Sequence, residues 1–379
     1  MKKIIYFTTA IDKTDYKDYL EYWDVSPNLS NQNFHYKLIK AISITNEVNV
    51  ISVRPINKNY QLDKLESGIK VEDNIIWNYV EVKNSRLDKL LSLDKRIKEV
   101  VNEERKNECV IIVDTMNRYL LKEAIKYAHR YKFKIYGVCT DNPINISFVS
   151  NGYKKDLLSM GKKLDGYIAL TPKLNELFNI NNKPYVLIDG ITENFEPETN
   201  INIKFPYVFF GGSLLPRYGV DNLIEAFERL NKVNLKLVIC GHHEPEGFKE
   251  KIKKYSDIIY LGPLTYDDVC AIQKEAECAV NPRPTDVLID EYSIPSKTLE
   301  YLSNEVLTIS VDNALLKKHY KDAIIWTKTG SADELYVALV RALSLSDKEK
   351  EKYISIGKEL VEKYTSLDSV NKLIQELIL

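Results

Sequence analysis

Tyr207–Phe227 reads YVFFGGSLLPRYGVDNLIEAF, an apolar run followed by two glycines and then by an amphipathic segment. The run YVFF is apolar throughout instead of alternating with polar residues, which favours a strand buried on both faces of a parallel sheet. After it, Leu223, Phe227 and Leu230 recur with the spacing of one helix face. The stretch therefore predicts a strand, a glycine turn and a helix, which together form the repeating unit of α/β proteins.

Apolar runs of the same kind recur along the whole chain, and helix-period segments lie between them. In the first half they begin at Lys2, Val48, Glu108, Lys134, Gly166 and Pro184. In the second half they begin at Tyr207, Leu235, Ile258, Glu277, Val306 and Ala323. Because this alternation of strand and helix occurs twice over, we predict an α/β protein with two doubly wound, Rossmann-like domains.

The segment Asn194–Pro206, NFEPETNINIKFP, is polar, holds two prolines and lacks any periodicity. Such a segment is typical of a linker. It predicts a first domain of residues 1–195 and a second of residues 196–358, and it leaves residues 359–379 as a C-terminal helix.

The composition argues against several classes of protein. Lys and Arg number 53 against 54 Asp and Glu, so no excess of positive charge is available for general nucleic-acid binding. The five cysteines contain no Cys-x-x-Cys pair, which argues against a disulfide framework or a zinc site and for a reducing cytosol.

Hydropathy argues against export and against a membrane span. The N-terminal apolar run is too short for a signal sequence, and no stretch approaches the roughly 18 apolar residues of a spanning helix. The amphipathic segment Arg86–Lys106 favours a solvated surface helix over a helix that lies on a membrane. We expect a cytoplasmic protein whose membrane contact is limited to its surface.

Glycine, proline or a charged residue follows four successive strand-like runs in the second half. These residues are Gly211, Gly212, Gly241, Gly262, Pro282 and Arg283. Ligands of open α/β sheets bind beyond the carboxyl ends of the strands, where glycine lets the backbone approach a phosphate or a base closely. A single glycine can equally serve to turn a strand into a helix, but four similar strand ends favour a nucleotide site.

The segment Asp290–Glu305, DEYSIPSKTLEYLSNE, predicts a helix that begins near Pro295, because proline fits the first turn. The free amides of Ser296 and Lys297, together with the lysine charge, suit a diphosphate. Glu300 would repel phosphates, but its carboxylate can accept hydrogen bonds from a ribose diol. The alternative is a capped surface helix with an exposed glutamate.

Pro295–Ser310, PSKTLEYLSNEVLTIS, resembles the Pro-Ser-Lys-x-x-Glu-Tyr-Leu segment of retaining glycosyltransferases of the GT-B fold, family 4 of the glycosyl transferases group 1. The opening stretch resembles the first strand, glycine loop and helix of the family's second domain. LVICGHHE, IIYLGPLTYDDV and AECAVNPRP match the following strand-end loops in order. The resemblance covers most of residues 206–343. It is weaker in the first half, where DGYIALTPKLNELF and PYVLIDGIT are similar to the end of the acceptor domain.

The resemblance implies two Rossmann-like domains that face a central cleft. The first domain would hold the acceptor, the second would bind the nucleotide sugar, and the C-terminal helix would pack back toward the first. Glu300 would bind the donor ribose, the backbone after Gly262 would meet the base, and Gly212, Arg217 and Lys297 would surround the diphosphate. The full donor-side set is Gly211, Gly212, Arg217, Gly241, Gly262, Arg283, Tyr292, Ser296, Lys297 and Glu300.

The sequence departs from the family pattern at two places. Ser213 and Tyr218 stand where the family often has the arginine of Gly-Arg-Leu and the lysine of Lys-Gly, so the usual cationic clamp is missing. Arg217, Lys297 and Arg283 are the available substitutes. Tyr292 stands at the first glutamate of the family's Glu-x7-Glu motif, which puts the sugar contact assigned there in doubt.

Catalysis by such an enzyme needs stabilisation of the departing diphosphate. The sequence has no Asp-x-Asp triplet, so we expect no metal and no cofactor beyond a UDP- or GDP-sugar substrate. The catalytic candidates are Asp141, Arg217 and Lys297, and those on the acceptor side are Asn31, Asn33, Asp114 and Asn142. Each polar residue of the first domain can equally be a helix cap or turn former. We expect His35 on a helix surface, and His242 and His243 beside the site without a chemical role.

These observations favour a retaining hexosyltransferase that extends a glycan or glycolipid in bacterial surface polysaccharide biosynthesis, such as a capsule. Its place would be the cytoplasm, with room for peripheral contact at the inner face of the membrane and no nucleic-acid partner. The missing clamp keeps open a degenerate, non-catalytic partner subunit. A sugar-nucleotide epimerase of the same fold is a further alternative, and a two-lobed solute-binding protein is disfavoured because no export signal precedes the first strand.

Overall fold

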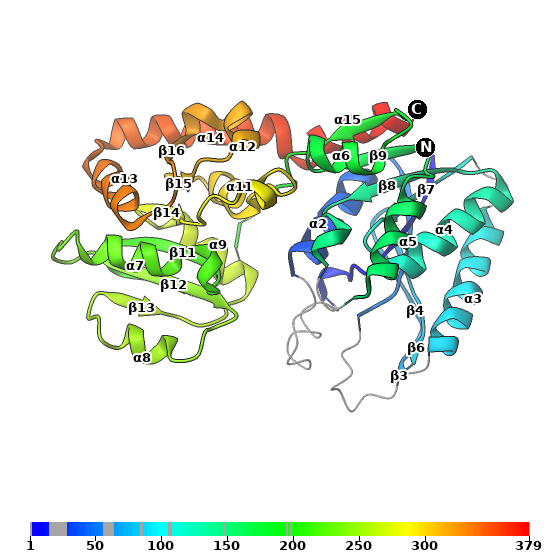
Figure 1. Ribbon diagram of the computed structural model, residues 1–379, viewed down its shortest axis with the longest axis horizontal. Coiled ribbons are helices and arrows are strands. Elements are labelled where there is room, and N and C mark those ends of the chain that lie inside the picture. The colour runs from blue at the N-terminus through cyan, green and yellow to red at the C-terminus, as the bar shows by residue number, and fades with distance from the viewer. Residues whose placement is uncertain are drawn as a thin grey trace. The chain divides into compact units, whose positions relative to one another are not determined.

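The computed structural model describes residues 2–14, 29–55, 64–83, 86–104, 108–146, 149–194, 196–197, 199 and 201–378. The chain forms two compact units, shown in Figure 1: Met1–Ile191 with Leu367–Leu379, and Thr192–Ser366. The boundary lies a few residues before the predicted one. The predicted C-terminal segment 359–379 is divided, because α14 (Asp347–Thr365) belongs to the second unit and α15 (Leu367–Ile378) to the first.

The first unit is built on a sheet of eight strands within the described residues, in the order β10-β9-β8-β7-β1-β2-β5-β4. The strands are β1 (Lys3–Thr8), β2 (Glu47–Ser52), β4 (Gly68–Glu72), β5 (Ile75–Tyr79), β7 (Cys109–Asp114), β8 (Lys134–Cys139), β9 (Gly166–Ala169) and β10 (Tyr185–Leu187). Their pairings are parallel except for the edge pair β4 and β5. β3 (Lys64–Leu65) and β6 (Val82–Lys83) form a separate short ribbon.

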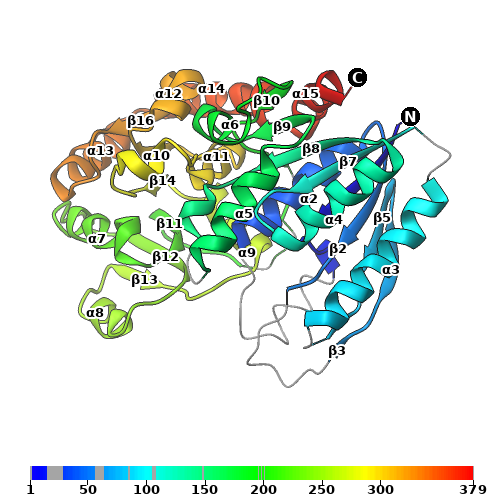
Figure 2. The same ribbon diagram turned by 45° about the vertical axis from the view of Figure 1, so that its right-hand side comes forward.

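Helices cover both faces of this sheet. They are α2 (Leu29–Ser43), α3 (Arg86–Glu104), α4 (Arg118–Tyr131), α5 (Asn151–Gly161), α6 (Pro172–Phe178) and α15, with the short η1 (Pro143–Asn145). α15 packs on α2. α3 lies beside α4 (Figure 2), and the side chains of Lys126 and Tyr127 on α4 both donate to Asp94 on α3. The predicted surface helix Arg86–Lys106 is therefore α3, which buries Leu93, Ile97 and Val101.

The second unit is built on a parallel sheet in the order β13-β12-β11-β14-β15-β16. These strands are β11 (Tyr207–Ser213), β12 (Lys236–His242), β13 (Ile258–Tyr260), β14 (Cys278–Asn281), β15 (Thr308–Val311) and β16 (Ile324–Thr327). The helices are α7 (Val220–Glu228), α8 (Phe248–Ile252), α9 (Tyr266–Lys274), α10 (Val287–Asp290), α11 (Ser296–Ser303), α12 (Ala314–Tyr320), α13 (Ala332–Ser344) and α14, with η2 (Pro216–Tyr218) and η3 (Lys321–Ala323).

The first strand of this sheet shows why its sequence is apolar throughout. Val208 and Phe210 pack in a core with residues of α7 and α13, while Tyr207 and Phe209 pack in another with residues of α9 and α11. Successive side chains of a strand point to opposite faces. Both faces are therefore buried, as we predicted from the run YVFF.

Each sheet contains one point where the winding direction reverses. In the second unit β11 lies between β12 and β14, and in the first unit β1 lies between β2 and β7. Ligands of open α/β sheets bind beyond the carboxyl ends of the strands at such a reversal point. Sequence-predicted site residues follow both reversal points.

The carboxyl ends of β11 and β12 approach so closely that one glycine is required there. Gly241 pairs with Gly212 and has a φ of 152°, and a Cβ added to it would lie 1.7 Å from the carbonyl oxygen of Gly212. A Cβ added to Gly212 meets nothing nearer than a Phe210 ring carbon at 3.6 Å. The pair thus offers one crowded and one open position on neighbouring strands.

We predict that Gly241→Ala destabilises the fold by about 3 kcal/mol or more, because overpacking and a strained backbone combine. Gly212→Ala is the matched control and should cost less than about 1 kcal/mol. Urea unfolding of both variants measures the difference. Equal midpoints for the two variants would contradict the close approach of these strands.

Candidate functional site

A buried polar network fixes the start of α11, the helix that carries Lys297 and Glu300. The Thr298 hydroxyl lies 3.1 Å from that of Ser310 on β15, and Asn281 Nδ2 of β14 donates to Thr298 Oγ1 at 2.9 Å. Thr298 and Ser310 have no exposed surface. Since this network ties the first turn to two central strands, the helix start lies in a fixed place at the reversal point of the second sheet.

α11 begins at Ser296, one residue later than we predicted, and Pro295 is its N-cap without a side-chain hydrogen bond. The Thr298 amide donates to the Pro295 carbonyl. The amides of Ser296 and Lys297 stand too early in the helix to reach a carbonyl of the same helix. Ser296 itself is exposed. The helix start therefore presents amide hydrogens where the helix dipole favours an anion.

Lys297 and Glu300 form an ion pair on the same helix turn. Lys297 Nζ lies 3.1 Å from Glu300 Oε2, and the side chains are 40% and 15% exposed. Burial lowers the pKa of Lys297, but the charge of Glu300 and the hydrogen bond to it, with smaller effects of Cys240 and Cys270, together raise the pKa above its ordinary value, so the lysine stays charged. In this structure the two groups satisfy each other, and a diphosphate would have to draw Lys297 away from its partner.

The glycine loop after β11 is joined to the same helix. Tyr301 on α11 is fully buried, and its hydroxyl accepts from the Gly211 amide at 3.2 Å. Gly212 follows at the strand end, and the loop then turns through Gly219, whose added Cβ would lie 2.2 Å from the Pro282 carbonyl oxygen. The loops after β11 and β14 thus touch each other beside α11.

The two histidines after β12 lie at the same edge. The pKa of His242 is lowered mainly by burial and to a smaller extent by the charges of His243 and Lys297. His243 is exposed, and its Nδ1 lies 3.2 Å from Ser213 Oγ. Gly262, after the next strand, has a φ of 74° and open space around its Cα.

The remaining predicted cations differ in their availability. Arg217 is exposed in η2, where its guanidinium lies 5.2 Å from the centre of the Tyr218 ring. Arg283 is instead engaged with Asp290, at 2.7 Å, in the loop that leads into α11. Tyr292 is half-buried in that loop. Arg217 is exposed and unlike Arg283 faces solvent, and Lys297, although ion-paired, is 40% exposed against 16% for Arg283, so both are better placed to meet a diphosphate.

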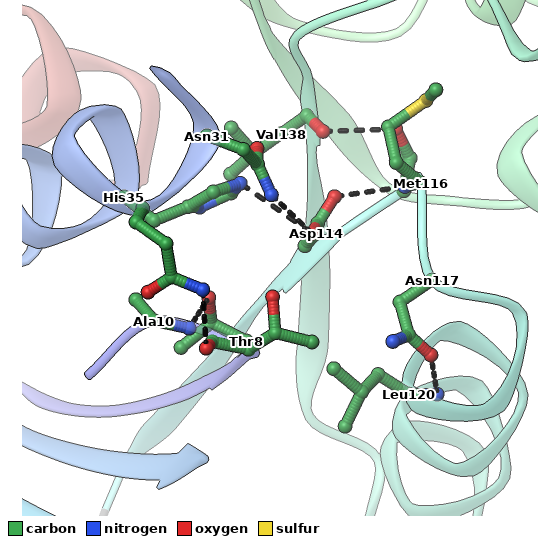
Figure 3. Close-up of polar contacts among 12 residues, drawn as sticks. Thr8, Ala10, Asn31, His35, Asp114, Met116, Asn117, Leu120 and Val138 are labelled. Atoms are coloured by element: carbon green, nitrogen blue, oxygen red, sulfur yellow. Dashed lines mark hydrogen bonds and ion pairs between the residues drawn. The ribbon is translucent and has the colours of Figure 1, made fainter. Parts of the chain in front are cut away.

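The reversal point of the first sheet gathers polar side chains around Asp114, the last residue of β7 (Figure 3). Asp114 Oδ1 accepts from the Met116 amide at 2.8 Å, and Asn31 Nδ2 donates to Oδ2 at 3.5 Å. Asn31 lies in the first turn of α2, so it is neither a helix cap nor a turn former. The structure thus brings Asn31 to Asp114, whereas Asn33 is exposed and does not join them.

His35 completes this cluster, and our prediction of a surface histidine was wrong. It is fully buried, with Nδ1 2.7 Å from the Tyr6 hydroxyl and Nε2 3.6 Å from Asp114 Oδ2. When Tyr6 donates to Nδ1, the ring hydrogen sits on Nε2 and faces the carboxylate, whereas the other tautomer would face it with a lone pair. Burial lowers the pKa of His35 although Asp114 acts in the opposite direction.

Asp141 and Asn142 follow β8, one strand further along. Asp141 is exposed, and its Oδ1 accepts from the Asn142 amide at 2.7 Å. Asn142 is buried and caps η1 by accepting from the Ile144 amide. Asp141 is therefore available to a ligand, while Asn142 has a structural task.

Three further findings bear on the kind of site. Among the described residues no group of three or more His, Cys, Asp and Glu side chains is arranged to hold a metal ion. Nor does the described part of the chain contain a helix long and apolar enough to cross a membrane. All five cysteines are buried, and none of them forms a disulfide.

Residues 191–360 match the family described as Glycosyl transferases group 1, which covers most of the second unit and less than half of the chain. No curated protein sequence matches the chain. The resemblance inferred from the strand-end loops is thus confirmed for the second unit at the level of this family.

Solved structures are similar over the whole chain. Sucrose-phosphate synthase from Thermosynechococcus elongatus has a TM-score of 0.69 at 13% identity and covers 99% of this chain and 98% of its own. An α,α-trehalose-phosphate synthase (UDP-forming) from Burkholderia xenovorans, in complex with glucose-6-phosphate, has a TM-score of 0.64 at 10% identity and covers 100% of both chains. An E. coli structure described as trehalose-6-phosphate bound with UDP-2-fluoro glucose has a TM-score of 0.64 at 11% identity. The match covers 100% of this chain and 99% of that chain. The chain therefore has the GT-B fold of two Rossmann-like domains, as predicted.

The depressed pKa of His35 predicts how the stability of the fold depends on pH. Free histidine has a pKa of about 6.5, so below that value the unfolded chain binds a proton that the folded chain binds less readily. The free energy of unfolding should fall as the pH drops through about 6.5, until the lower folded pKa is reached. His35→Gln should reduce this dependence, which urea unfolding between pH 8 and 5 would measure.

His129→Gln serves as the control, because His129 is an exposed histidine in the last turn of α4. It should keep the dependence of the wild type. A His35→Gln variant with an unchanged pH profile would show that His35 is not held neutral by its surroundings.

Proposed function

We propose that this protein is a retaining glycosyltransferase that moves a sugar from a UDP- or GDP-sugar to a hydroxyl of a glycan or lipid-linked acceptor. The observation that carries the proposal is the pair Lys297 and Glu300 on the first turns of α11, at the reversal point between β11 and β14. The family match over residues 191–360 and the GT-B fold support it.

The second unit offers separate groups for each part of the donor. The amides at the start of α11, Lys297 and the exposed Arg217 suit the diphosphate, since all of them present positive charge or hydrogen-bond donors. Glu300 suits the ribose hydroxyls, which donate hydrogen bonds to a carboxylate. The open backbone at Gly262 would lie against the base.

Catalysis in this arrangement is stabilisation of the leaving group. As the bond between sugar and diphosphate loosens, negative charge grows on the diphosphate, and groups fixed in advance stabilise that charge. Lys297 would pass from Glu300 to the phosphate oxygens, and Arg217 would stand in for the family's missing cationic clamp.

The first unit would supply the acceptor side. Asp141 is exposed after β8, and Asn31, His35 and Asp114 gather at the reversal point of the sheet. A carboxylate such as Asp114 accepts from hydroxyl groups and repels phosphate, which favours a sugar hydroxyl as the group bound there. We assign the protein to the synthesis of bacterial surface polysaccharide, with peripheral contact at the inner face of the membrane.

A degenerate, non-catalytic partner subunit is the second candidate, because Arg283 is engaged with Asp290 and the usual clamp is missing. Thermal shift with a panel of nucleotide sugars tests both readings, since a bound ligand raises the melting temperature by mass action. UDP-glucose comes first, because one similar structure holds UDP-2-fluoro glucose. Binding followed by release of sugar, detected by mass spectrometry, supports the enzyme. Binding without turnover favours the partner subunit, and no binding by any member would refute the proposal.

Lys297→Ala should lower kcat by about 10²- to 10³-fold, because the lysine contact strengthens as the diphosphate departs. Lys317→Ala is the matched control, since Lys317 is also ion-paired, with Asp312, and is 37% exposed. Initial rates with saturating donor measure the effect. If both variants had equal rates and unchanged melting temperatures, Lys297 would have no role in catalysis.

Glu300→Gln should raise KM for the donor more than it lowers kcat. Ribose is bound equally in the ground state and in the transition state, so the substitution weakens the binding of both by the same free energy and affects KM more than kcat. Glu305→Gln, at an exposed glutamate paired with Lys358, is the control and should change neither constant. A fall in kcat at unchanged KM would contradict the ribose assignment.

Turnover should survive chelation by EDTA, because helix amides, Arg217 and Lys297 are expected to stabilise the leaving group without a metal. The rate with and without EDTA measures this. Complete loss of turnover that manganese restores would show that a metal site has been missed.

A further inference from the structure

The carboxylate of Glu300 is held from a second side by a residue that the sequence did not single out. Gln273 lies in α9, has no exposed surface, and its Nε2 donates to Glu300 Oε1 at 3.4 Å. Lys297 occupies the other oxygen, Oε2. Both oxygens of Glu300 are thus engaged, Oε2 by a donor from its own helix and Oε1 by a donor from α9.

Gln273 is itself held in one orientation. Asn304, buried at the end of α11, donates through Nδ2 to Gln273 Oε1. Turning the Gln273 amide over would place its carbonyl oxygen against the Glu300 carboxylate, where two acceptors repel each other. The amide group of Gln273 therefore points at Glu300 and is fixed by its contact with Asn304.

The two donors to Glu300 differ in what a nucleotide would do to them. Lys297 is 40% exposed and can turn to a diphosphate, whereas Gln273 is fully buried and its amide is held between Glu300 and Asn304. A carboxylate has about four sites for hydrogen bonds, so one bond from Gln273 leaves room for both hydroxyls of a ribose. When Lys297 turns to the diphosphate, the hydrogen bond from Gln273 still holds Oε1 of the carboxylate.

We propose that Gln273 is a positioning residue of the nucleotide site, which orients Glu300 toward the ribose hydroxyls through the chain Asn304–Gln273–Glu300. This inference rests on the proposed function of the second unit. It adds a determinant on α9, outside the helix that carries Lys297 and Glu300. Gln273 does not touch the ligand, so its effect must pass entirely through Glu300.

The experiment compares ribonucleotide and dideoxynucleotide affinity by calorimetry. The probe is UDP or GDP, whichever binds the wild-type protein more tightly, and its 2′,3′-dideoxy form. Gln273→Met keeps the length of the side chain and removes both hydrogen bonds. It should weaken ribonucleotide binding about tenfold, and it should leave the affinity for the dideoxy form unchanged.

A double-mutant cycle separates positioning from a general structural effect. In a Glu300→Ala background, Gln273→Met should change ribonucleotide affinity by less than about twofold, because the group it positions is gone. Gln375→Met, the same change on α15 in the first unit, should alter no affinity. Equal weakening of both nucleotide forms by Gln273→Met, or a full effect in the Glu300→Ala background, overturns the inference alone. Failure of the wild type to bind any ribonucleotide overturns the proposed function and the inference with it.

Discussion

The parallel pairing of β11 with β12 on one side and β14 on the other is the constraint on which the candidate donor site depends. Buried strands of this kind can offer polar groups only at their ends, since both of their faces are covered by helices. The winding reverses between β11 and β14, and the start of α11 lies beside the loops that follow these two strands. Every charge assigned to the donor follows from that placement.

The same constraint explains why so much of the fold could be predicted. The twelve apolar runs found in the sequence are the strands of the two sheets, apart from one hairpin of the first unit. That hairpin, β4 and β5, was missed because its outer strand alternates and keeps Ile69 and Val71 exposed. A search for continuous apolar runs does not detect such an edge strand. The Asp73-Asn74 turn between them was an available signal, and Asp73 has the positive φ that such turns use.

The candidate site could be predicted where a residue follows a strand or starts a helix, and less well where burial decides. His35 shows the difference. With Leu38, Ile39 and Ile42 it forms the spacing i, i+3, i+4 and i+7, so the helix stripe itself places it in the core, whereas Phe34 is only partly buried. Gln273 is similar, since it lies three residues after the buried Cys270. In both cases a polar side chain occupies a position that the spacing of apolar residues assigns to the core, and a buried polar group needs a hydrogen-bond partner.

The buried contacts among Asn281, Thr298 and Ser310 have a consequence for the kinetics of association. They hold the first turn of α11 against two central strands, so its amides need no ordering step before they can meet an anion. Complexes that form without such a step combine at rates set by diffusion, orientation and charge, and differences in affinity then reside mainly in how long the ligand stays. On the proposed function, donors that differ only in their sugar would arrive at similar rates and be told apart by their residence times.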